Sequence, residues 1–287
     1  PRPARRALAI HQPMRPVDQA VWHLAGAVAA IGGMRLLRRA PTPELRTTLA
    51  EFVPSGGTLV AADTLATGRA VALVLDRNGA PCCLAKVAVT EEGRARLRAE
   101  ALNARVLGPL LDAPLRAPTV LAERDGVVVF SAVDWRLRRR PWVLDEDAAH
   151  ALGRFHAKGA ARVGGLGHGD FAPWNVMRSG DDLFLIDWED AGDGLPDFDD
   201  LFHFLVQGHA LLGHPSEHDL LEAVCGRGWL APLIESYAEG AGLGCDDIAE
   251  RFEGELTRTS RWGSIPRASL LVALGRRRSA TAGTERR

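Results

Sequence analysis

Short apolar runs separated by turn residues occupy the chain from about residue 57 to residue 133. Strands are predicted at residues 57–63, 69–76 and 81–89, where β-branched and aliphatic residues dominate. Asn78 and Gly79 stand between the second and third runs, and both tolerate the positive φ of a hairpin turn. A further strand pair, 118–124 and 127–133, flanks a turn at Asp125–Gly126. This part of the chain is therefore predicted to be an antiparallel sheet.

One helix is predicted inside this β-rich region, over residues 90–111. Thr90 is suited to cap its first turn, and Glu91 and Glu92 complement the positive end of the helix dipole. Four apolar residues are expected to form its buried stripe: Leu97, Ala101, Leu102 and Leu107.

From residue 144 onward the pattern is mostly helical. Asp145 is a plausible cap for a helix whose predicted buried face is Leu144, Ala148, Leu152 and Phe155. A tight hairpin is predicted at Ser179–Asp182, and helical segments resume at about residue 198 and continue to about 273. We therefore expect an α+β fold with an N-terminal helical extension (1–50), a small antiparallel β lobe with one main helix (51–133), a larger mostly helical lobe (134–275) and a disordered tail (276–287).

Composition narrows the class of protein only slightly. The 287 residues carry a formal net charge of −1, which gives no basic field for nucleic acid. The four cysteines show no metal-binding spacing, so reduced thiols and a cytoplasmic location are expected. The longest apolar run, residues 20–34, is shorter than the roughly 20 residues that span a bilayer. We expect a packed helix there and no membrane partner.

Candidate chemistry is concentrated in the segment HGDFAPWNV, residues 168–176. Asp170 and Asn175 are separated by four residues, and Asp187 follows Asn175 by twelve, at the end of the apolar run LFLID. This spacing is typical of a kinase catalytic centre. Phosphoryl transfer needs a carboxylate that orients the attacking hydroxyl and accepts its proton, a role suited to Asp170. It also needs oxygen ligands for Mg²⁺, which Asn175 and Asp187 can supply.

These two segments resemble the aminoglycoside phosphotransferase and choline kinase family, whose members are relatives of the protein kinases that phosphorylate small molecules. The sequence is similar to the family's H-G-D-x-x-x-x-N loop and to its I-D-W-E motif at residues 186–189. The resemblance implies a two-lobed protein-kinase-like fold, ATP as cofactor, Asp170 as catalytic base, and Asn175 and Asp187 as Mg²⁺ ligands. It also implies that Asp200 holds the catalytic loop and that His168 braces it.

The β-rich region offers candidates for binding the nucleotide. Lys86 lies among apolar residues in a predicted strand, where an unpaired ammonium is costly, and Glu100 in the following helix is its best-placed partner. The loop 64–69 contains only Gly68 as a candidate phosphate-covering glycine. The segment after residue 130 is the expected hinge, where backbone groups of Ser131 and Val133 can meet adenine.

The leading hypothesis is an ATP- and Mg²⁺-dependent kinase that phosphorylates a hydroxyl group of a small molecule, such as an aminoglycoside-, choline- or sugar-like acceptor. Three alternatives stay open: a protein kinase, a nucleotide-binding pseudokinase acting as a scaffold, and a metal-dependent hydrolase. Seven acidic residues from Asp187 to Asp200 also leave open a negatively charged acceptor mouth. Trp174, Trp188 and Trp262 are expected to pack in the core or at its rim.

Overall fold

The chain was analysed as a computed structural model. The structure describes residues 20–21, 23–24, 27, 43–64, 69–133, 144–160, 163–258 and 268–275. The chain divides into two compact units. The first contains residues 1–109, 116–139 and 176–190, and the second contains residues 110–115, 140–175 and 191–287. Each unit is described by itself.

A five-stranded antiparallel sheet forms the centre of the first unit, with the order β1-β2-β3-β6-β5. Its strands are β1 (Thr58–Thr64), β2 (Arg69–Leu75), β3 (Pro81–Ala88), β5 (Val120–Arg124) and β6 (Val127–Ser131). The predicted turn between β2 and β3 is confirmed. The Asp76 carboxylate accepts hydrogen bonds from the amides of Asn78 and Ala80, and Gly79 has φ of 78°.

Both faces of this sheet are covered by apolar side chains, because successive residues of a strand point to opposite faces. On one face, helix α3 (Pro43–Leu49) contributes Leu49 to a cluster with Ala72, Val74, Cys83 and Ala85. The other face carries Leu73, Leu75 and Leu84, which pack with Val133. Lys86 is two residues after Leu84 and so points to this second face.

Helix α4 (Glu91–Val106) is capped as predicted, since the Thr90 hydroxyl accepts from the Gly93 amide at 3.1 Å. Leu97 and Ala101 are buried, which confirms half of the predicted stripe. Leu102 is 59% exposed, so its place in the stripe is wrong. The buried face continues through Glu100 and Ala104 instead, which follow Leu97 at the helical spacings of three and seven residues.

A hairpin from the middle of the sequence completes the first unit. Strands β8 (Val176–Ser179) and β9 (Asp182–Leu185) pair with Ser179 opposite Asp182, as the sequence predicts. Met177, Phe184 and Ile186 pack with the cluster on the Leu84 face of the sheet. This packing explains why residues 176–190 belong to the first unit. The two-residue strand β4 (Leu115–Arg116) lies beside β9, and a short 3-10 helix, η5 (Trp188–Asp190), follows.

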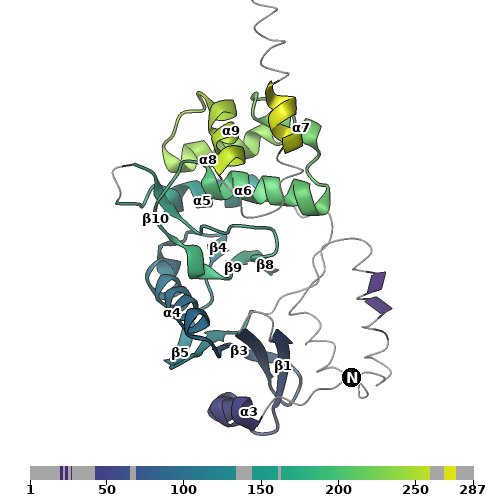
Figure 1. Cartoon of the computed structure of the whole chain (residues 1–287), viewed down its shortest axis with the longest axis vertical. Coiled ribbons are helices and arrows are strands. Elements are labelled where there is room, and N and C mark those ends of the chain that lie inside the picture. Colours follow the sequence, from purple (N-terminus) through teal and green to yellow (C-terminus); the bar gives the residue numbers. More distant parts are fainter. Residues whose placement is uncertain are drawn as a thin grey trace, which may run out of the picture. The chain divides into compact units, whose positions relative to one another are not determined.

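The second unit is mainly helical (Figure 1). Its helices are α5 (Glu146–His156), α6 (Asp199–Gln207), α7 (Glu217–Ala223), α8 (Ala231–Ala241) and α9 (Ile248–Arg258), and residues 268–275 are also helical. Two short antiparallel strands, β7 (Gly165–Gly167) and β10 (Gly192–Leu195), accompany them. Their glycine-rich sequences lack the apolar runs from which the other strands were predicted.

Helices α5 and α8 form the closest packing in this unit. The predicted face of α5 is confirmed, because Leu144, Ala148, Leu152 and Phe155 are all buried. The predicted cap is confirmed too: the Asp145 carboxylate accepts from the Ala148 amide at 3.0 Å. A Cβ atom at Gly153 would lie 2.1 Å from the Tyr237 carbonyl oxygen, so only glycine permits this approach.

Several expectations concern the ends of the chain. Of the run 20–34, five residues are described. They are helical, but Val21 and Leu24 are 63% and 67% exposed, so the predicted packing is not seen at these positions. Within the described part of the chain, none of the helices is long and apolar enough to cross a membrane. The tail 276–287 lies outside the described residues. The proposed lobe boundaries stay a prediction.

Candidate active site

A lysine cluster, defined as Lys86, Glu100 and Asp187, lies in the first unit. The Lys86 ammonium forms ion pairs with the Glu100 and Asp187 carboxylates. The side chain of Lys86 is 11% exposed and that of Glu100 is 3% exposed, whereas that of Asp187 is 43% exposed. Three segments that are distant in sequence therefore meet: strand β3, helix α4 and the short segment between strand β9 and η5. The two hydrogen-bonded carboxylates offset the free energy that burial of the Lys86 ammonium costs.

Each member of the cluster is positioned by packing of its own element. Lys86 follows Leu84 on one face of the sheet, and its ammonium lies 5.6 Å from the centre of the Phe130 ring. Glu100 stands on the buried face of α4, between Leu97 and Ala104. The Asn103 amide on the same helix donates to the Trp188 carbonyl at 2.9 Å, which fastens α4 to the segment after Asp187.

The charges in the lysine cluster support one another. Burial alone would lower the pKa of Lys86, but the Asp187 and Glu100 carboxylates outweigh it and hold the pKa above its ordinary value. The ammonium therefore stays charged at neutral pH. Asp187 also has φ of 64°, in the left-handed region that non-glycine residues adopt uncommonly and most often at functional positions.

The loop between β7 and Asn175 is held by a buried carboxylate in the second unit. Asp200, in the first turn of α6, accepts from the His168 amide at 2.6 Å and from the Gly169 amide at 3.0 Å. Gly169 has φ of 77°, which directs two successive amides at one carboxylate. Burial raises the pKa of Asp200, while the imidazole and amides of the loop act in the opposite direction. These contacts are those that the family resemblance implies.

Asp170 follows this anchored pair of amides, and both of its carboxylate oxygens have a donor. The Asn175 side-chain nitrogen donates to Asp170 Oδ2 at 2.8 Å and to the Asp170 carbonyl at 2.9 Å. His203 Nε2 lies 3.1 Å from Asp170 Oδ1. The Asp170 side chain is 22% exposed, so a carboxylate of fixed orientation keeps access to solvent.

His203 was not identified in the sequence. It lies on α6, three residues after Asp200, and its other ring nitrogen, Nδ1, is 3.9 Å from Glu255 Oε1 on α9. We call His203, Asp170 and Glu255 the histidine cluster. Burial alone would lower the pKa of His203, but hydrogen bonds and charge interactions with Asp170 and Glu255 raise it to about 9. The spacing from Asp200 puts both side chains on one side of α6, a signal that could have been read only with knowledge of the loop's position.

The remaining predicted nucleotide residues have mixed outcomes. Gly68 and its loop lie outside the described residues. The Ser131 amide donates to the Thr119 carbonyl at 2.7 Å, so that donor is already engaged within the sheet. Val133 is buried against Leu73 and Leu75. The contribution of Ser131 and Val133 to binding adenine therefore stays a prediction.

Most of the seven acidic residues between Asp187 and Asp200 are engaged within the fold. Glu189 pairs with Arg96, Asp193 accepts from the Ala160 amide, and Asp197 pairs with Arg251. Asp187 and Asp200 have the partners given above. These internal partners argue against a negative mouth made by this segment. Trp188 is buried and donates to the Leu185 carbonyl, in line with core packing, and Trp262 lies outside the described residues.

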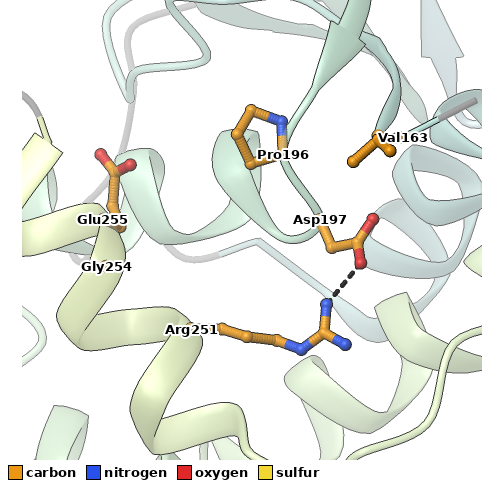
Figure 2. A pocket seen from close by; sticks show the side chains of 7 residues that line it. Val163, Pro196, Asp197, Arg251, Gly254 and Glu255 are labelled. Atoms are coloured by element: carbon orange, nitrogen blue, oxygen red, sulfur yellow. Dashed lines mark hydrogen bonds and ion pairs between the residues drawn. The ribbon is translucent and has the colours of Figure 1, made fainter. Parts of the chain in front are cut away.

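A pocket of about 450 Å³ opens in the second unit beside the histidine cluster. Figure 2 shows Arg251 reaching from α9 to Asp197, with Glu255 one turn further along the same helix. Glu255 contributes to the wall although it is only 2% exposed. The pocket therefore borders the residue that contacts His203.

The oxygen donors suit Mg²⁺. In the second unit the Asn175 side-chain nitrogen donates to Asp170, and in the first unit Asp187 offers a partly exposed carboxylate. Among the described residues there is no group of three or more His, Cys, Asp or Glu side chains arranged to hold a metal. Mg²⁺ in phosphoryl-transfer enzymes is usually held by one or two protein ligands together with the substrate's phosphates.

Comparison with known proteins agrees with this chemistry. The family model "Phosphotransferase enzyme family" (APH) matches residues 90–223, a range that includes Glu100, Asp170, Asn175, Asp187 and Asp200. The match confirms the resemblance that the two motifs indicate, and it supports the prediction that the chain is a phosphotransferase. No curated protein matches the sequence.

Solved structures are similar in fold. A choline kinase from Cryptosporidium parvum Iowa II aligns with a TM-score of 0.57 at 8% identity, covering 85% of this chain and 97% of that one. A macrolide 2'-phosphotransferase from Brachybacterium faecium aligns with a TM-score of 0.49 at 15% identity, covering 81% and 98%. The likeness to the choline kinase confirms the predicted protein-kinase-like α+β fold.

Proposed function

We propose that this chain transfers the γ-phosphoryl group of ATP to a hydroxyl group of a small molecule, with Asp170 as the base. The observation that carries the proposal is the lysine cluster. A mostly buried lysine is held by two carboxylates, and one of them, Asp187, belongs to the second sequence motif and lies two residues after strand β9. An ammonium has three N–H donors, so Lys86 can still donate to a phosphate oxygen while both carboxylates hold it.

The division of labour follows from the chemistry of each group. Lys86 would bind and orient the phosphates, and Glu100 would keep the ammonium in place. Asn175 and Asp187 would hold Mg²⁺, which supplies positive charge to the transferring phosphoryl group when bound. Asp170, fixed through both oxygens, would orient the acceptor hydroxyl and accept its proton. Positioning and charge then lower the barrier without a covalent intermediate.

The acceptor belongs to the same proposal. The solved structures that resemble this fold include kinases and phosphotransferases named for small molecules, choline and a macrolide. Their names support a small-molecule hydroxyl as acceptor in preference to a protein. The pocket bordered by Asp197, Arg251 and Glu255 is a candidate for holding a part of the acceptor remote from the reacting hydroxyl, because Asp170 is not among the residues that line it. We place the reaction in the cytoplasm, as the cysteine usage suggests.

The primary test is Asp170→Asn, measured as ADP release from Mg·ATP with a panel of aminoglycosides, choline-like amines and sugars. Loss of a general base typically costs 10²–10⁴-fold, so turnover should fall by about that factor. ATP binding, followed by thermal shift, should stay near the wild-type value. Asp181→Asn, in the exposed turn of the β8–β9 hairpin, is the matched control and should leave both unchanged.

Thermal shift with ATP in the presence and absence of Mg²⁺ separates this proposal from the scaffold and hydrolase alternatives. A kinase should be stabilised more by ATP with the metal than by ATP alone, because bound Mg²⁺ would add positive charge that favours binding of the phosphates. A response to ATP with no turnover on any acceptor would favour the scaffold. The absence of any response would remove the basis for a nucleotide site.

A further inference from the structure

The histidine cluster brings together two buried ionisable side chains and one that is partly exposed. His203 is 4% exposed and Glu255 is 2% exposed, and burial of ionisable groups is costly unless each has a partner. The elements that bring them together are remote in sequence: Asp170 comes from the loop after β7, His203 from α6 and Glu255 from α9. Only Asp170 reaches solvent to a useful extent.

The protonation of His203 follows from its neighbours. Nε2 faces one carboxylate oxygen at 3.1 Å and Nδ1 faces another at 3.9 Å. A neutral imidazole carries one N–H, so it can donate to only one of the two, whereas the imidazolium carries two. Asp200, on the same helix, adds a third carboxylate in its electrostatic environment. All of these acidic neighbours favour the charged ring.

We propose that His203 is a positioning residue for Asp170, and that Glu255 in turn holds the His203 ring. This inference rests on the proposed function, because it assigns the supports of the base that the function requires. The imidazolium would fix Oδ1 while Asn175 fixes Oδ2. The carboxylate plane is thereby set by two donors from opposite sides, and misplacing a catalytic group by about 1 Å can cost 10²-fold.

Glu255 connects the histidine cluster to the pocket in the second unit. Because Glu255 also borders the pocket shown in Figure 2, the line Asp170–His203–Glu255 runs from the base to the wall of the candidate acceptor pocket. Removing the Glu255 charge should free the ring to rotate or lose its proton. The effect on Asp170 would then be indirect and smaller than that of removing His203.

The first test needs no acceptor. NMR titration of the His203 ring carbon-bound protons in the full chain should give a pKa near 9 in the wild type. The value should fall in Asp170→Asn and in Glu255→Gln. A His203 signal that titrates near 6.5 and ignores both substitutions would overturn the arrangement.

The second test is kinetic and uses ADP release from Mg·ATP with the acceptor panel named above. His203→Ala should lower kcat by about 10- to 100-fold with little change in KM for ATP, since only the base is misplaced. His203→Gln, which keeps an N–H donor, should recover much of that loss. His156→Gln is the matched control for removing a buried imidazole that bonds to a carboxylate elsewhere.

The two ideas fail in different ways. If the wild type turns over, Asp170→Asn is inactive and His203→Ala matches the wild type, the positioning role is wrong and the proposed function stands. If the wild type releases no ADP with any acceptor, the proposed function fails and this inference fails with it. A merely structural histidine would give a third pattern. His203→Ala would be inactive and unfolded by circular dichroism. His203→Gln would be folded and fully active, and the pH profile of its turnover would match that of the wild type.

Discussion

Each unit of the molecule encloses one cation between two carboxylates, but the two cations differ in kind. The clusters are Lys86 with Glu100 and Asp187 in the first unit, and His203 with Asp170 and Glu255 in the second. In both, one carboxylate is nearly inaccessible and the other is more open. Glu100 and Glu255 are 3% and 2% exposed, whereas Asp187 and Asp170 are 43% and 22% exposed. The buried acid holds the cation, and the open acid is the one proposed to act.

The two cations differ in the pH at which each loses its proton. The pKa of Lys86 is held above its ordinary value, so its charge is constant over the physiological range. His203, with a pKa raised to about 9, is charged at neutral pH but loses its proton at mildly alkaline pH. A permanent charge suits phosphate binding. A ring with two donors suits the orientation of a carboxylate.

The largest expected effect comes from breaking the lysine cluster with Lys86→Met. Turnover should fall by about 10²–10³-fold, because one preorganised positive charge on the phosphates is removed. Stability should also fall, by about 3 kcal/mol, since Glu100 is left buried without its partner. Steady-state kinetics and urea unfolding measure the two effects.

The control for this change is Lys158→Met. The sequence contains only these two lysines, and Lys158 forms a more exposed ion pair with Asp112. Its loss should cost less than about 1 kcal/mol and leave turnover unchanged. Equal losses of turnover in the two variants would show that Lys86 has no particular role with the nucleotide.

The next effect is a pH dependence of stability that only the histidine cluster should show. The His203 pKa is about 9 in the folded chain and near 6.5 when unfolded. A raised folded pKa means that the stabilisation is complete below pH 6.5 and is lost as the pH rises through 9. This raised pKa of His203 corresponds to a stabilisation of about 3 kcal/mol at low pH.

The measurement is urea unfolding at intervals from pH 6 to pH 9.5 for the wild type and for His203→Gln. The difference in unfolding free energy between the two should shrink over this window. The lysine cluster adds no slope here, because its cation titrates only at higher pH. A constant difference across the window would contradict a charged ring in the folded protein.

The sequence could predict the Lys86–Glu100 pair of the lysine cluster because both residues are marked by local pattern, but it did not predict the ion pair between Lys86 and Asp187. Lys86 interrupts an apolar strand, and Glu100 falls on the buried face of the following helix together with Leu97 and Ala101. The helix caps at Thr90 and Asp145 are equally local, and both were predicted correctly. Leu102 was misplaced because a continuous apolar count does not reveal which face of α4 meets the sheet.

The histidine cluster could not be predicted in the same way. His203 lies in the apolar segment LFHFLV, where it resembles any buried histidine, and Glu255 lies in a charged helix that resembles a solvated face. Their meeting depends on how α6 and α9 pack, and the residue before α6, Phe198, has φ of 64°, which the amino-acid composition does not indicate. Long-range packing, not local propensity, decides such contacts.

A smaller effect should distinguish the two buried acids. Glu100→Gln should raise the KM for ATP by about 10-fold, since weakening one charge-assisted hydrogen bond costs about 1.5 kcal/mol. Glu255→Gln should lower kcat by a similar factor and leave the KM for ATP unchanged. Initial rates over a range of ATP concentrations separate the two parameters. The same kinetic change in both variants would contradict a lysine cluster that binds ATP and a histidine cluster that orients the base for the acceptor.

The smallest effects should come from the helix caps that support each unit. Thr90→Ala removes the acceptor for the Gly93 amide at the start of α4, and Asp145→Ala removes the acceptor for the Ala148 amide at the start of α5. Each should cost about 1 kcal/mol and lower the melting temperature by about 2–4 °C. Turnover should stay within about twofold in both, because Glu100 lies more than two turns beyond Thr90 and remains held by Lys86. A selective rise in the KM for ATP in Thr90→Ala would instead show that the lysine cluster depends on the whole of α4. Unchanged turnover in Asp145→Ala would show that the histidine cluster is supported independently of the start of α5.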